Sequence, residues 1–396
     1  MSSDPIVVCA AVRTPLGRYL GELSPLPAHR LGAHAIAAAL QRAGIAPERV
    51  DEVLMGCVLG AGQGQAPARQ AARAAGLPDA TPAVTINKVC GSGMKAAMQA
   101  HDALVAGSID VAVAGGMESM SNAPYLLQRA RAGYRVGHDR IFDHMALDGL
   151  EDAYEPGRSM GEFGEALARD YGFDRAAQDA YAHETLRRAQ AAIESGAFAG
   201  EIVAVPVADK AGPRLVEHDE HPRKVSLDKI AALKPAFAAD GSITAASASA
   251  NADGAAALLL TRRSTAQREG WPVLARIVAH ASHSQAPAQY TTAPIPAVRK
   301  LLARAGWNAE DVDLFEINEA FAVVAMAAAR DLGIARERLN VNGGACALGH
   351  PIGATGARLL VTLIHALRRQ GGRRGVAALC IGGGEATAMA VEIDPG

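Results

Sequence analysis

An internal repeat constrains the fold of this chain more than any other feature does. Residues 40–56 align with residues 302–318 at one constant offset, and each half continues with a glycine-rich loop, a helix and a strand ending in glycines, at 111–118 and 378–385. Because order and spacing persist over several elements, two similar halves explain the match better than a chance likeness of two amphipathic helices does. Such halves usually pack about a pseudo-twofold axis, which can bring equivalent loops together. The residues of the first segment that recur in the second are Leu40, Arg42, Ala43, Gly44, Glu48, Val50 and Asp51.

Short apolar runs alternate with helical patterns along both halves. Apolar runs without polar interruption, placed between helices, indicate a sheet that is covered on both faces. The sequence therefore predicts an α/β fold. The predicted strands are 6–12, 51–56, 110–116, 256–260, 273–280, 312–318 and 376–384, and the predicted helices are 27–44, 91–107, 293–306, 320–333 and 353–371.

Residues 121–249 interrupt the repeat, and we interpret them as an insertion over one face of the duplicated body. They contain a basic stretch at 129–140, an acidic one at 148–155 and a helical pattern at 174–196. Excursions of this kind often carry substrate contacts. The basic stretch is open to two interpretations, a solvated loop or a role in assembly or anion binding. The expected domains are an N-terminal half of 1–120 plus 250–272, a loop domain of 121–249 and a C-terminal half of 273–396.

The composition of the chain excludes several classes of protein. Its 396 residues are 49% hydrophobic and 20% charged, which suits a globular protein and not a disordered one. The 39 basic and 41 acidic residues nearly cancel, so the chain lacks the electrostatic footprint of a nucleic-acid binder. No apolar run reaches the roughly 18–20 residues that span a bilayer. We therefore expect neither a nucleic-acid nor a membrane partner and, because the N-terminus lacks a secretory pattern, a cytoplasmic location.

The cysteines are predicted to be free thiols, and Cys90 is the first candidate for chemistry. There are five cysteines, an odd number without a Cys-x-x-Cys pair, which argues against a disulfide scaffold or a structural zinc site. Cys90 follows a β-prone run and opens a helix whose first turn is Gly-Ser-Gly. The helix dipole favours a thiolate there, and the glycines let a substrate approach. A buried, inert thiol is the alternative that local sequence leaves open.

Two further glycine-rich segments carry His350 and Cys380. His350 lies between Gly349 and Pro351 in a loop before a helix, a poor place to bury a structural histidine and a good place to present an imidazole to a ligand. A metal pair of His350 with Cys346 lacks a second pair of ligands, so we expect no metal. Cys380 ends an apolar strand and precedes three glycines. Its thiol either faces a site that has free backbone N–H groups or packs in the core.

Asn318 lies where a predicted strand gives way to a helix. N-capping of that helix is by itself a sufficient reason for an asparagine here. Each of the four candidates thus has an ordinary explanation when it is taken alone. Their combination in one chain is harder to explain by packing and capping.

Four sequence blocks carry a family resemblance. The blocks VCGSGMKA, NEAFA, GGACALGHPIGATGA and CIGGG, in this order and at these separations, closely resemble the thiolase family. The N-terminal VRTPLG, AGGMESMS at 114–121 and DGAAALLL at 253–260 are similar to thiolases as well, so the resemblance covers essentially the whole chain. It implies a duplicated thiolase-like fold, in which two similar α/β halves form a layered αβαβα arrangement with an inserted loop domain.

The resemblance implies an acyl-CoA C-acyltransferase. Thiolases condense two acetyl-CoA molecules to acetoacetyl-CoA plus CoA, or cleave a 3-ketoacyl-CoA with CoA, through an acyl-cysteine. By similarity, Cys90 is the nucleophile, His350 activates it and helps bind the thioester oxygen, and Cys380 moves the α-proton of the second acyl-CoA. Asn318 would hold a water that joins His350 in one oxyanion hole, and the backbone N–H groups of Cys90 and Gly382 would form the other. No cofactor is required, because CoA and acyl-CoA are substrates.

The resemblance also implies CoA contacts in and near the insertion. Met160 and Gly161 match a Met-Gly pair in a CoA-contacting loop, and Arg223 matches an arginine near the CoA nucleotide, where a cation suits the phosphates. Residues 244–249 resemble the loop that contacts pantetheine. Ordinary loop or core packing stays the alternative for each position. The residues expected to contact CoA are Leu150, Met160, Arg223, Phe237, Ala245, Ser249 and Phe321.

Several positions depart from the family pattern. Ser159 stands where many biosynthetic members have histidine, Ser247 where many have asparagine, and Tyr290 in place of the methionine of a Met-Gly pair. Glu385 and Ala386 follow the glycine run, where a residue and then glycine are usual. None of these changes removes a catalytic group. They leave the preferred acyl length open, since tyrosine is bulkier than methionine near the acyl group.

Other activities and the assembly remain to be distinguished. A broad-chain degradative 3-ketoacyl-CoA thiolase of fatty acid or aromatic degradation fits the same motifs, because one site runs both directions. Cys380 and the CoA matches argue against a β-ketoacyl synthase-like enzyme and against an unrelated cysteine hydrolase. The presence of Cys90 and His350 argues against a non-catalytic member. We expect a homodimer or homotetramer, with the strand-prone 81–87 pairing across subunits and 129–140 building tetramers.

Overall fold

The strands of both halves pair into one mixed sheet. A computed structural model describes residues 4–208 and 212–394, and within them the strand order is β12-β13-β14-β11-β1-β10-β5-β3-β4, with β2 beside β10. The strands are β1 (Ile6–Arg13), β2 (Gly17–Arg18), β3 (Glu52–Gly56), β4 (Ala83–Ile86), β5 (Val111–Ser119), β10 (Ala252–Arg262), β11 (Ala275–Ser284), β12 (Leu314–Ile317), β13 (Arg374–Ile381) and β14 (Glu385–Glu392).

The pairing pattern repeats from one half to the other. In the N-terminal half, β3 and β5 are parallel, and β10 and β1 follow as antiparallel neighbours. In the C-terminal half, β12 and β13 are parallel, and β14 and β11 follow in the same antiparallel way. A short pairing of Val7 and Val8 with Arg276 and Ala275 joins the two halves. The predicted duplication is therefore confirmed in the topology.

The strand register corrects one part of the sequence alignment. Ala112 of β5 lies opposite Glu52, and Gly375 of β13 lies opposite Leu314, the counterpart of Glu52 in the repeat. This register matches Met117 with Cys380, whereas the alignment of 111–118 with 378–385 pairs Glu118 with Glu385. The alignment was wrong because its glycines differ in role. Gly115 and Gly116 lie inside β5, whereas the glycines after Cys380 form the turn between β13 and β14.

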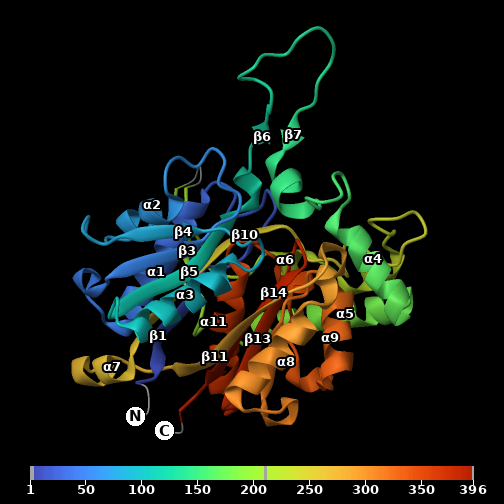
Figure 1. Ribbon diagram of the computed structural model, residues 1–396. Coiled ribbons are helices and arrows are strands. Elements are labelled where there is room, and N and C mark those ends of the chain that lie inside the picture. Colours follow the sequence, from blue (N-terminus) through green and yellow to red (C-terminus); the bar gives the residue numbers. More distant parts are fainter. Residues whose placement is uncertain (1–3, 209–211, 395–396) are drawn as a thin grey trace.

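Helices and half-sheets form five layers (Figure 1). Helices α1 (Ala28–Ala43) and α2 (Pro67–Ala74) cover the outer face of the N-terminal half, and α8 (Pro294–Ala305) covers that of the C-terminal half. Helices α3 (Ser92–Ala106) and α11 (Thr355–Gln370) contact each other and strands of both halves, so they form the central layer. The expected αβαβα arrangement is confirmed. The remaining helices of this part are α7 (Arg263–Glu269), α9 (Ala322–Leu332) and α10 (Ala345–Leu348).

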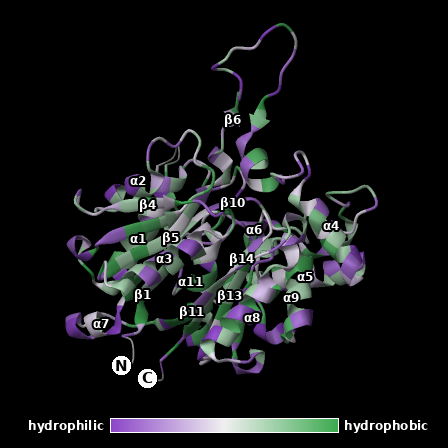
Figure 2. Ribbon diagram, viewed as in Figure 1, coloured by the Kyte–Doolittle hydropathy of each residue, from purple (hydrophilic) through white to green (hydrophobic). Residues whose placement is uncertain are grey.

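Apolar side chains fill the spaces between the layers, where green ribbon gathers in Figure 2. One core cluster joins α3 and α11 to strands of both halves and includes Met94, Leu104, Leu360 and Leu379. Separate clusters lie beneath the outer helices of each half. Among the described residues, no helix has both the length and the apolar character needed to cross a membrane.

The repeated segment has the same structure in both halves because it carries the same helix stop. Helix α1 ends at Gly44 (φ 65°) and α8 ends at Gly306 (φ 67°), in the left-handed region that glycine adopts without a steric penalty. The next N–H groups, of Ile45 and Trp307, then donate to Leu40 O at 3.1 Å and Leu302 O at 3.0 Å. Because both helices end in the same way, the chain turns back toward the sheet after each of them.

The segment between β5 and β10 forms the insertion. Its helix α4 packs against α9, and its helix α5 packs against α10. Between β6 and β7 the chain forms a long loop, which holds the basic stretch 129–140 and projects away from the body (Figure 1). The exact domain boundaries stay a prediction. The elements are β6 (Tyr125–Leu126), β7 (Phe142–Asp143), a helical turn at Ala146–Leu150, α4 (Met160–Tyr171), α5 (Arg175–Glu194), β8 (Val205–Val207), β9 (Arg214–Val216) and α6 (His221–Lys224).

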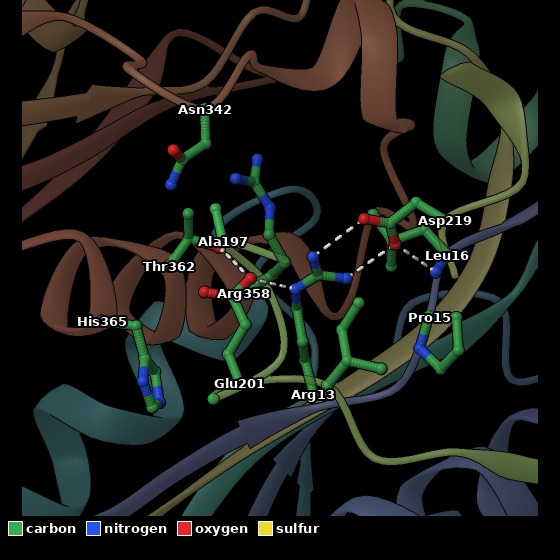
Figure 3. A network of polar contacts seen from close by, with 12 residues as sticks. Arg13, Pro15, Leu16, Ala197, Glu201, Asp219, Asn342, Arg358, Thr362 and His365 are labelled. Carbon is green, nitrogen blue, oxygen red and sulfur yellow. Dashed lines mark hydrogen bonds and ion pairs between the residues drawn. The ribbon is translucent and has the colours of Figure 1, made fainter. Parts of the chain in front are cut away.

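A buried ionic network ties the insertion to the duplicated body (Figure 3). The Arg13 guanidinium on β1 donates to Glu201 at 2.5 Å and to both carboxylate oxygens of Asp219 at 2.7 and 2.8 Å. Thr362 on α11 donates to the same Glu201 at 3.1 Å. Arg13, Glu201 and Asp219 are fully buried. Removing one partner from such a pair leaves an uncompensated buried charge, at a cost of about 3–5 kcal/mol.

Candidate active site

Cys90 lies between β4 and the start of α3. The preceding residue, Val89, has φ 46°, a left-handed conformation that is unusual for a β-branched residue. This sharp turn sets Cys90 apart from the strand, and the backbone N–H groups of Gly382 and of Cys90 itself hydrogen-bond to its sulfur. Burial raises the pKa of the thiol to about 11, although these two hydrogen bonds lower it. The free protein therefore holds a neutral thiol at pH 7, because burial outweighs the groups that favour a thiolate.

Cys380 lies at the end of β13, in the other half of the molecule. Its side chain is buried, and burial together with the nearby Cys90 raises its pKa. The two thiols are thus close enough to influence each other's ionisation. Gly382, two residues beyond Cys380, is the residue whose N–H reaches the Cys90 sulfur. The structure therefore brings three of the predicted site residues, Cys90, Cys380 and Gly382, to one place.

His350 lies in a loop that is buried throughout residues 342–356. Its backbone N–H donates to Ala250 O at 2.8 Å, and its Nδ1 lies 2.6 Å from the hydroxyl of Thr355. That hydroxyl donates its single hydrogen to Pro351 O at 2.9 Å, so it accepts the one from Nδ1–H. This assigns the tautomer, which leaves Nε2 with a lone pair. Nε2 is buried and has no hydrogen-bond partner among the described residues.

His350 is neutral at pH 7, although its burial also makes it a weak base. Burial, followed by the charge of Arg358, lowers its pKa to about 3. The imidazole is therefore neutral at pH 7 and can accept a proton at Nε2. Arg358 is itself buried on α11 and reaches Glu316 on β12 at 3.4 Å. The charge that lowers the pKa of His350 is consequently held in place by the core.

Asn318 does not cap a helix. Its N–H donates to Ala378 O at 2.9 Å, but helix α9 begins after Phe321, three residues later. Both polar atoms of the Asn318 side chain are buried, and neither has a partner among the described residues. The capping interpretation is wrong. Buried amides in native proteins are almost always hydrogen-bonded, so this one is suited to hold a water or a ligand.

Most of the residues expected to contact CoA pack near the two thiols. Met160, Phe237 and Phe321 belong to the apolar cluster that contains Cys380, and the rings of Phe237 and Phe321 meet edge to face at 5.6 Å. Leu150 packs in the cluster that includes Cys90. These four side chains form the apolar surroundings of the thiols.

The other three expected contacts lie outside these two apolar clusters. Ala245 lines a cavity of about 210 Å³ together with Arg18, His221 and Leu233. The N–H of Ser249 donates to Ala320 O at 3.0 Å, which ties its loop to the segment after Asn318. Arg223 is exposed on α6, two residues from His221. A larger cavity of about 820 Å³, lined by Arg368, Arg369 and Arg373, contains none of the predicted site residues.

The positions that depart from the family pattern have structural roles. Tyr290 is buried, and its hydroxyl donates to Met160 O at 2.9 Å. Burial, together with nearby Cys380 and Cys90, raises its pKa, and its ring belongs to the apolar cluster that contains Cys380. Ser159 caps helix α4 in a reciprocal pair of hydrogen bonds with Glu162. The Oγ of Ser247 accepts the N–H of Thr244 at 2.9 Å.

Glu385 connects the two catalytic loops. It forms an ion pair with Lys88, two residues before Cys90, and accepts a hydrogen bond from Ser284 Oγ at 3.0 Å. The Lys88 ion pair lowers the pKa of Glu385, although burial opposes it. This departure from the family pattern therefore joins the nucleophile's loop to the turn after Cys380.

Sequence reasoning missed two residues that organise the site. Thr355, which sets the tautomer of His350, stands inside the block GATGA. Glu118, inside the block AGGMES, is fully buried and accepts N–H groups from Val58, Leu59 and Gly353 at 3.0, 3.1 and 2.8 Å. Burial raises the pKa of Glu118 to about 7. The signal for both was their position in the blocks quoted for the resemblance, where polar residues interrupt apolar or glycine-rich runs.

Comparisons with known proteins agree with the fold and with these blocks. The thiolase N-terminal domain model matches residues 6–264, and the thiolase C-terminal domain model matches residues 271–393. An acetyl-CoA acetyltransferase from Cupriavidus necator is 47% identical over 389 residues, 98% of this chain and 99% of that protein. A cytosolic acetyl-CoA acetyltransferase from Mus musculus is 47% identical over 98% of each chain.

Solved structures give the same result. The acetyl-CoA acetyltransferase of Bacillus anthracis superposes with a TM-score of 0.96 at 41% identity, over 99% of each chain. A thiolase from Ascaris suum, solved in complex with coenzyme A, superposes with a TM-score of 0.93 at 40% identity, over 98% of this chain and 100% of that one. Matching domain models, full-length relatives and the described architecture together show that the chain belongs to the thiolase family.

Proposed function

We propose that this protein is an acetyl-CoA acetyltransferase. It would condense two acetyl-CoA molecules to acetoacetyl-CoA and CoA, and in reverse cleave a 3-ketoacyl-CoA with CoA. Support comes from family membership, from the names of full-length relatives and from the coenzyme A bound to the Ascaris suum thiolase. The observation that carries the proposal is the hydrogen bond from Gly382 N–H to the Cys90 sulfur, which brings the predicted nucleophile of one half to the predicted base of the other.

The first step transfers an acetyl group to Cys90. His350 Nε2, neutral and unpartnered, takes the proton from the Cys90 thiol, and the thiolate attacks the carbonyl carbon of acetyl-CoA. The N–H groups of Cys90 and Gly382 lie at the sulfur, where they can receive the negative charge of the tetrahedral oxygen. The carbon–sulfur bond to CoA then breaks, and the CoA thiolate takes the proton back from His350. Because burial raises the pKa of Cys90 to about 11, this step needs a base.

The second step forms the carbon–carbon bond. Cys380 would first pass its thiol proton to His350, and the resulting thiolate takes a proton from the α-carbon of a second acetyl-CoA. The enolate attacks the acetyl group on Cys90. The Cys90–acetyl bond breaks, which releases acetoacetyl-CoA, and the Cys90 thiolate takes the proton back from His350. The developing enolate oxygen needs preorganised donors, each worth about 3–4 kcal/mol of barrier. His350 and a water held by the free amide of Asn318 would supply them.

The apolar surroundings suit the pantetheine arm of CoA. Met160, Phe237 and Phe321 line the approach to Cys380, and Leu150 lies beside Cys90. The cavity that includes Ala245 also contains Arg18 and His221, and Arg223 lies on the same helix as His221. The guanidinium groups of Arg18 and Arg223 suit the phosphates of a nucleotide, whereas burial lowers the pKa of His221 to about 4 and leaves it neutral. We propose that this cavity receives the nucleotide end of CoA and that Ser249 positions the pantetheine arm.

Tyr290 favours a short acyl group. Its buried ring lies in the apolar cluster that contains Cys380 and packs edge to face on Phe163 at 5.9 Å, which leaves less room near that thiol than a flexible methionine would. A broad-chain degradative thiolase remains the second candidate function, since the same catalytic groups run both directions. We therefore expect acetoacetyl-CoA to be cleaved faster than longer homologues.

Thiolytic cleavage tests the proposal. Purified protein would be mixed with CoA and acetoacetyl-CoA or longer 3-ketoacyl-CoA esters, and the loss of enolate absorbance would be followed, with Cys90→Ala as the control. Cleavage that depends on CoA and on Cys90 supports a thiolase, and the rates across chain lengths separate the two candidates. No cleavage at any length would contradict the proposal and point to carrier-bound substrates.

We further propose a tetramer with a cytoplasmic location and a role in fatty acid metabolism. The loop between β6 and β7 exposes Leu127, Tyr134, Val136 and Ile141, large apolar side chains suited to an interface. The location is supported by the cytosolic relative from Mus musculus. Light scattering of the full chain, and of a variant with residues 128–140 replaced by a short glycine-serine turn, tests the assembly. We expect a tetramer and a dimer, respectively, and a monomer for the full chain would contradict the proposal.

A further inference from the structure

A cluster of two histidines and one aspartate lies away from the thiols. His101 and Asp102 are on α3, in the N-terminal half, and His280 is on β11, in the C-terminal half. Asp102 Oδ1 lies 3.1 Å from His101 Nδ1 and 2.8 Å from His280 Nε2, and all three ligand atoms lie within 4.8 Å of one another. Within residues 4–208 and 212–394 this is the only group of three or more such side chains with this spacing.

The chemistry of the three side chains matches a transition-metal ion. Two imidazole nitrogens and one carboxylate oxygen are a common ligand set for Zn²⁺ and for other borderline divalent ions, including Co²⁺ and Ni²⁺. Neighbouring ligand atoms around such an ion lie about 3–3.5 Å apart, given metal–ligand bonds of about 2.0–2.2 Å. The distances from Asp102 Oδ1 to the two histidine nitrogens, 3.1 and 2.8 Å, are close to this range.

The cluster is also accessible to solvent. The imidazole side chains are 18% and 17% exposed and that of Asp102 is 57% exposed, so a hydrated ion can reach the site.

We propose that His101, Asp102 and His280 form a binding site for a divalent transition-metal ion of the Zn²⁺ class, with water at the remaining position. The ion would join the nucleophile's helix, α3, to the sheet of the other half. The site is separate from the reaction, because His101 lies eleven residues after Cys90 on α3, about 16 Å along the axis. Its role is to clamp two halves whose sheets otherwise pair only briefly, through Val7 and Val8.

Cobalt binding to the full-length, chelator-treated protein tests the proposal. Co²⁺ alone is the probe, because its visible d–d absorption reports the coordination geometry and thiolate ligation adds a strong near-ultraviolet charge-transfer band. We expect one Co²⁺ per chain at a site that lacks the thiolate band. Binding with a full thiolate band would instead place the ion on cysteines and overturn the proposal.

Variants locate the ion. His101→Ala and His280→Ala should each weaken Co²⁺ binding by about tenfold or more. The matched control His183→Ala, an exposed histidine on α5, should bind Co²⁺ as the unmodified protein does. Equal binding by all three variants would overturn the site.

A third variant covers the case in which a histidine variant does not fold. Asp102→Asn keeps the size of the side chain and removes the charge of one ligand, so it should also weaken Co²⁺ binding. The ion should raise the melting temperature of the unmodified protein by mass action and raise that of Asp102→Asn much less. An equal rise in both would contradict the clamp.

Discussion

The two halves share one scaffold, but only the C-terminal half keeps open polar positions at its strand ends. Gly56, at the end of β3, is the counterpart of Asn318 after β12. A Cβ at Gly56 would lie 2.6 Å from the Gly353 carbonyl and from Gly93 N, so the backbone closes that position. Asn318 instead carries a buried amide without a partner among the described residues. The duplication therefore gives two equivalent positions. At Gly56 the surrounding backbone fills the space, and at Asn318 the space holds a polar side chain.

The neighbouring strands, β5 in the N-terminal half and β13 in the C-terminal half, also differ in whether a side chain near the strand end serves packing or faces the site. Met117 is fully buried, and a Cβ on Gly32 of α1 would contact its sulfur at 2.5 Å. Its counterpart, Cys380, lies beside Cys90 and Tyr290. Met117 fills a core, whereas Cys380 is the proposed base, although both occupy the same register of the same topology.

The two central helices contact each other at their first turns. There Gly93 lies against Gly353 and Ala357, and Gly356 lies against Met94. A Cβ at Gly93 would lie 2.9 Å from Ala357 N, so a larger residue would separate the helices. Cys90 and His350 each lie a few residues before one of these turns, on segments of different halves.

The largest expected effects separate the two sulfurs. Cys380→Ala should slow condensation by about 10²–10⁴-fold, the usual contribution of a general base, and leave the fold intact. Met117→Ala should lower the free energy of unfolding by about 2–5 kcal/mol, because it leaves a cavity, and spare the turnover of the folded protein. Steady-state kinetics and urea unfolding of both variants check this. Unchanged condensation by Cys380→Ala would show that the base is assigned wrongly.

Asn318 offers the next test. Asn318→Ala should lower kcat by about 10²-fold, since it removes the group that holds a donor at the enolate oxygen. The free energy of unfolding should change little, because the amide has no protein partner among the described residues to lose. Kinetics and thermal unfolding, measured side by side, separate the two effects. A stable variant with full activity would mean that the amide holds no catalytic water.

Thr355 and Ser92 occupy matching places, each directly before the glycine of the helix crossing. Thr355→Val should lower kcat by about tenfold. The variant loses one hydrogen bond to the imidazole, worth about 1 kcal/mol, and with it the group that fixes the tautomer of His350. Ser92→Ala should instead lower stability, because Ser92 Oγ donates to Val89 O at 2.6 Å and accepts Lys88 N–H at 2.8 Å. An activity–pH profile that is the same for Thr355→Val and the unmodified protein would argue against the tautomer role.

Glu118 should affect stability and its pH dependence. Glu118→Gln should lower the free energy of unfolding by about 1–3 kcal/mol, because an amide cannot accept all three backbone N–H groups. The folded pKa of Glu118 is raised from 4.5 to about 7, so its contribution is fully present below pH 4.5 and is lost as the pH rises through 7. Urea titrations across this range should show a smaller decline for the variant. An equal decline in both proteins would assign the pH dependence to other groups.

The smallest effect belongs to the half-exposed contact between the two catalytic loops. Glu385→Gln should cost less than about 1 kcal/mol, because the Glu385 and Lys88 side chains are 34% and 21% exposed and solvent screens the pair. High salt should reduce the difference further. A large loss of stability would mean that Lys88 holds the two loops together more firmly than its exposure indicates.

Much of the fold was predictable, because its signals are local. Apolar runs and glycine stops marked the strands and helices to within a few residues, as at Gly44 and Gly306. The repeat predicted two halves, and the four blocks predicted the family. These features depend on the backbone preferences of single residues and on the pattern of apolar residues, and both can be seen in the sequence.

The polar details were not predictable, because they arise from contacts between distant segments. The hydroxyl partner of His350, the free amide of Asn318 and the raised pKa of Cys90 each depend on burial by elements of the other half or of the insertion. The register of β5 against β13 also escaped the alignment, since glycines inside a strand and glycines in a turn look alike in a sequence.

The buried network around Arg13 has a consequence for the order of folding. Arg13 and Asp219 are 206 residues apart in the chain, and Thr362 adds a third distant segment to Glu201. Contacts of such long range close late, because the loop entropy must be overcome before they stabilise anything. The insertion should therefore dock last, after β1 and α11 have met. A chain still emerging from the ribosome would lack the carboxylates that neutralise Arg13 until Asp219 has been made, and the network would be complete only after Thr362 has been made.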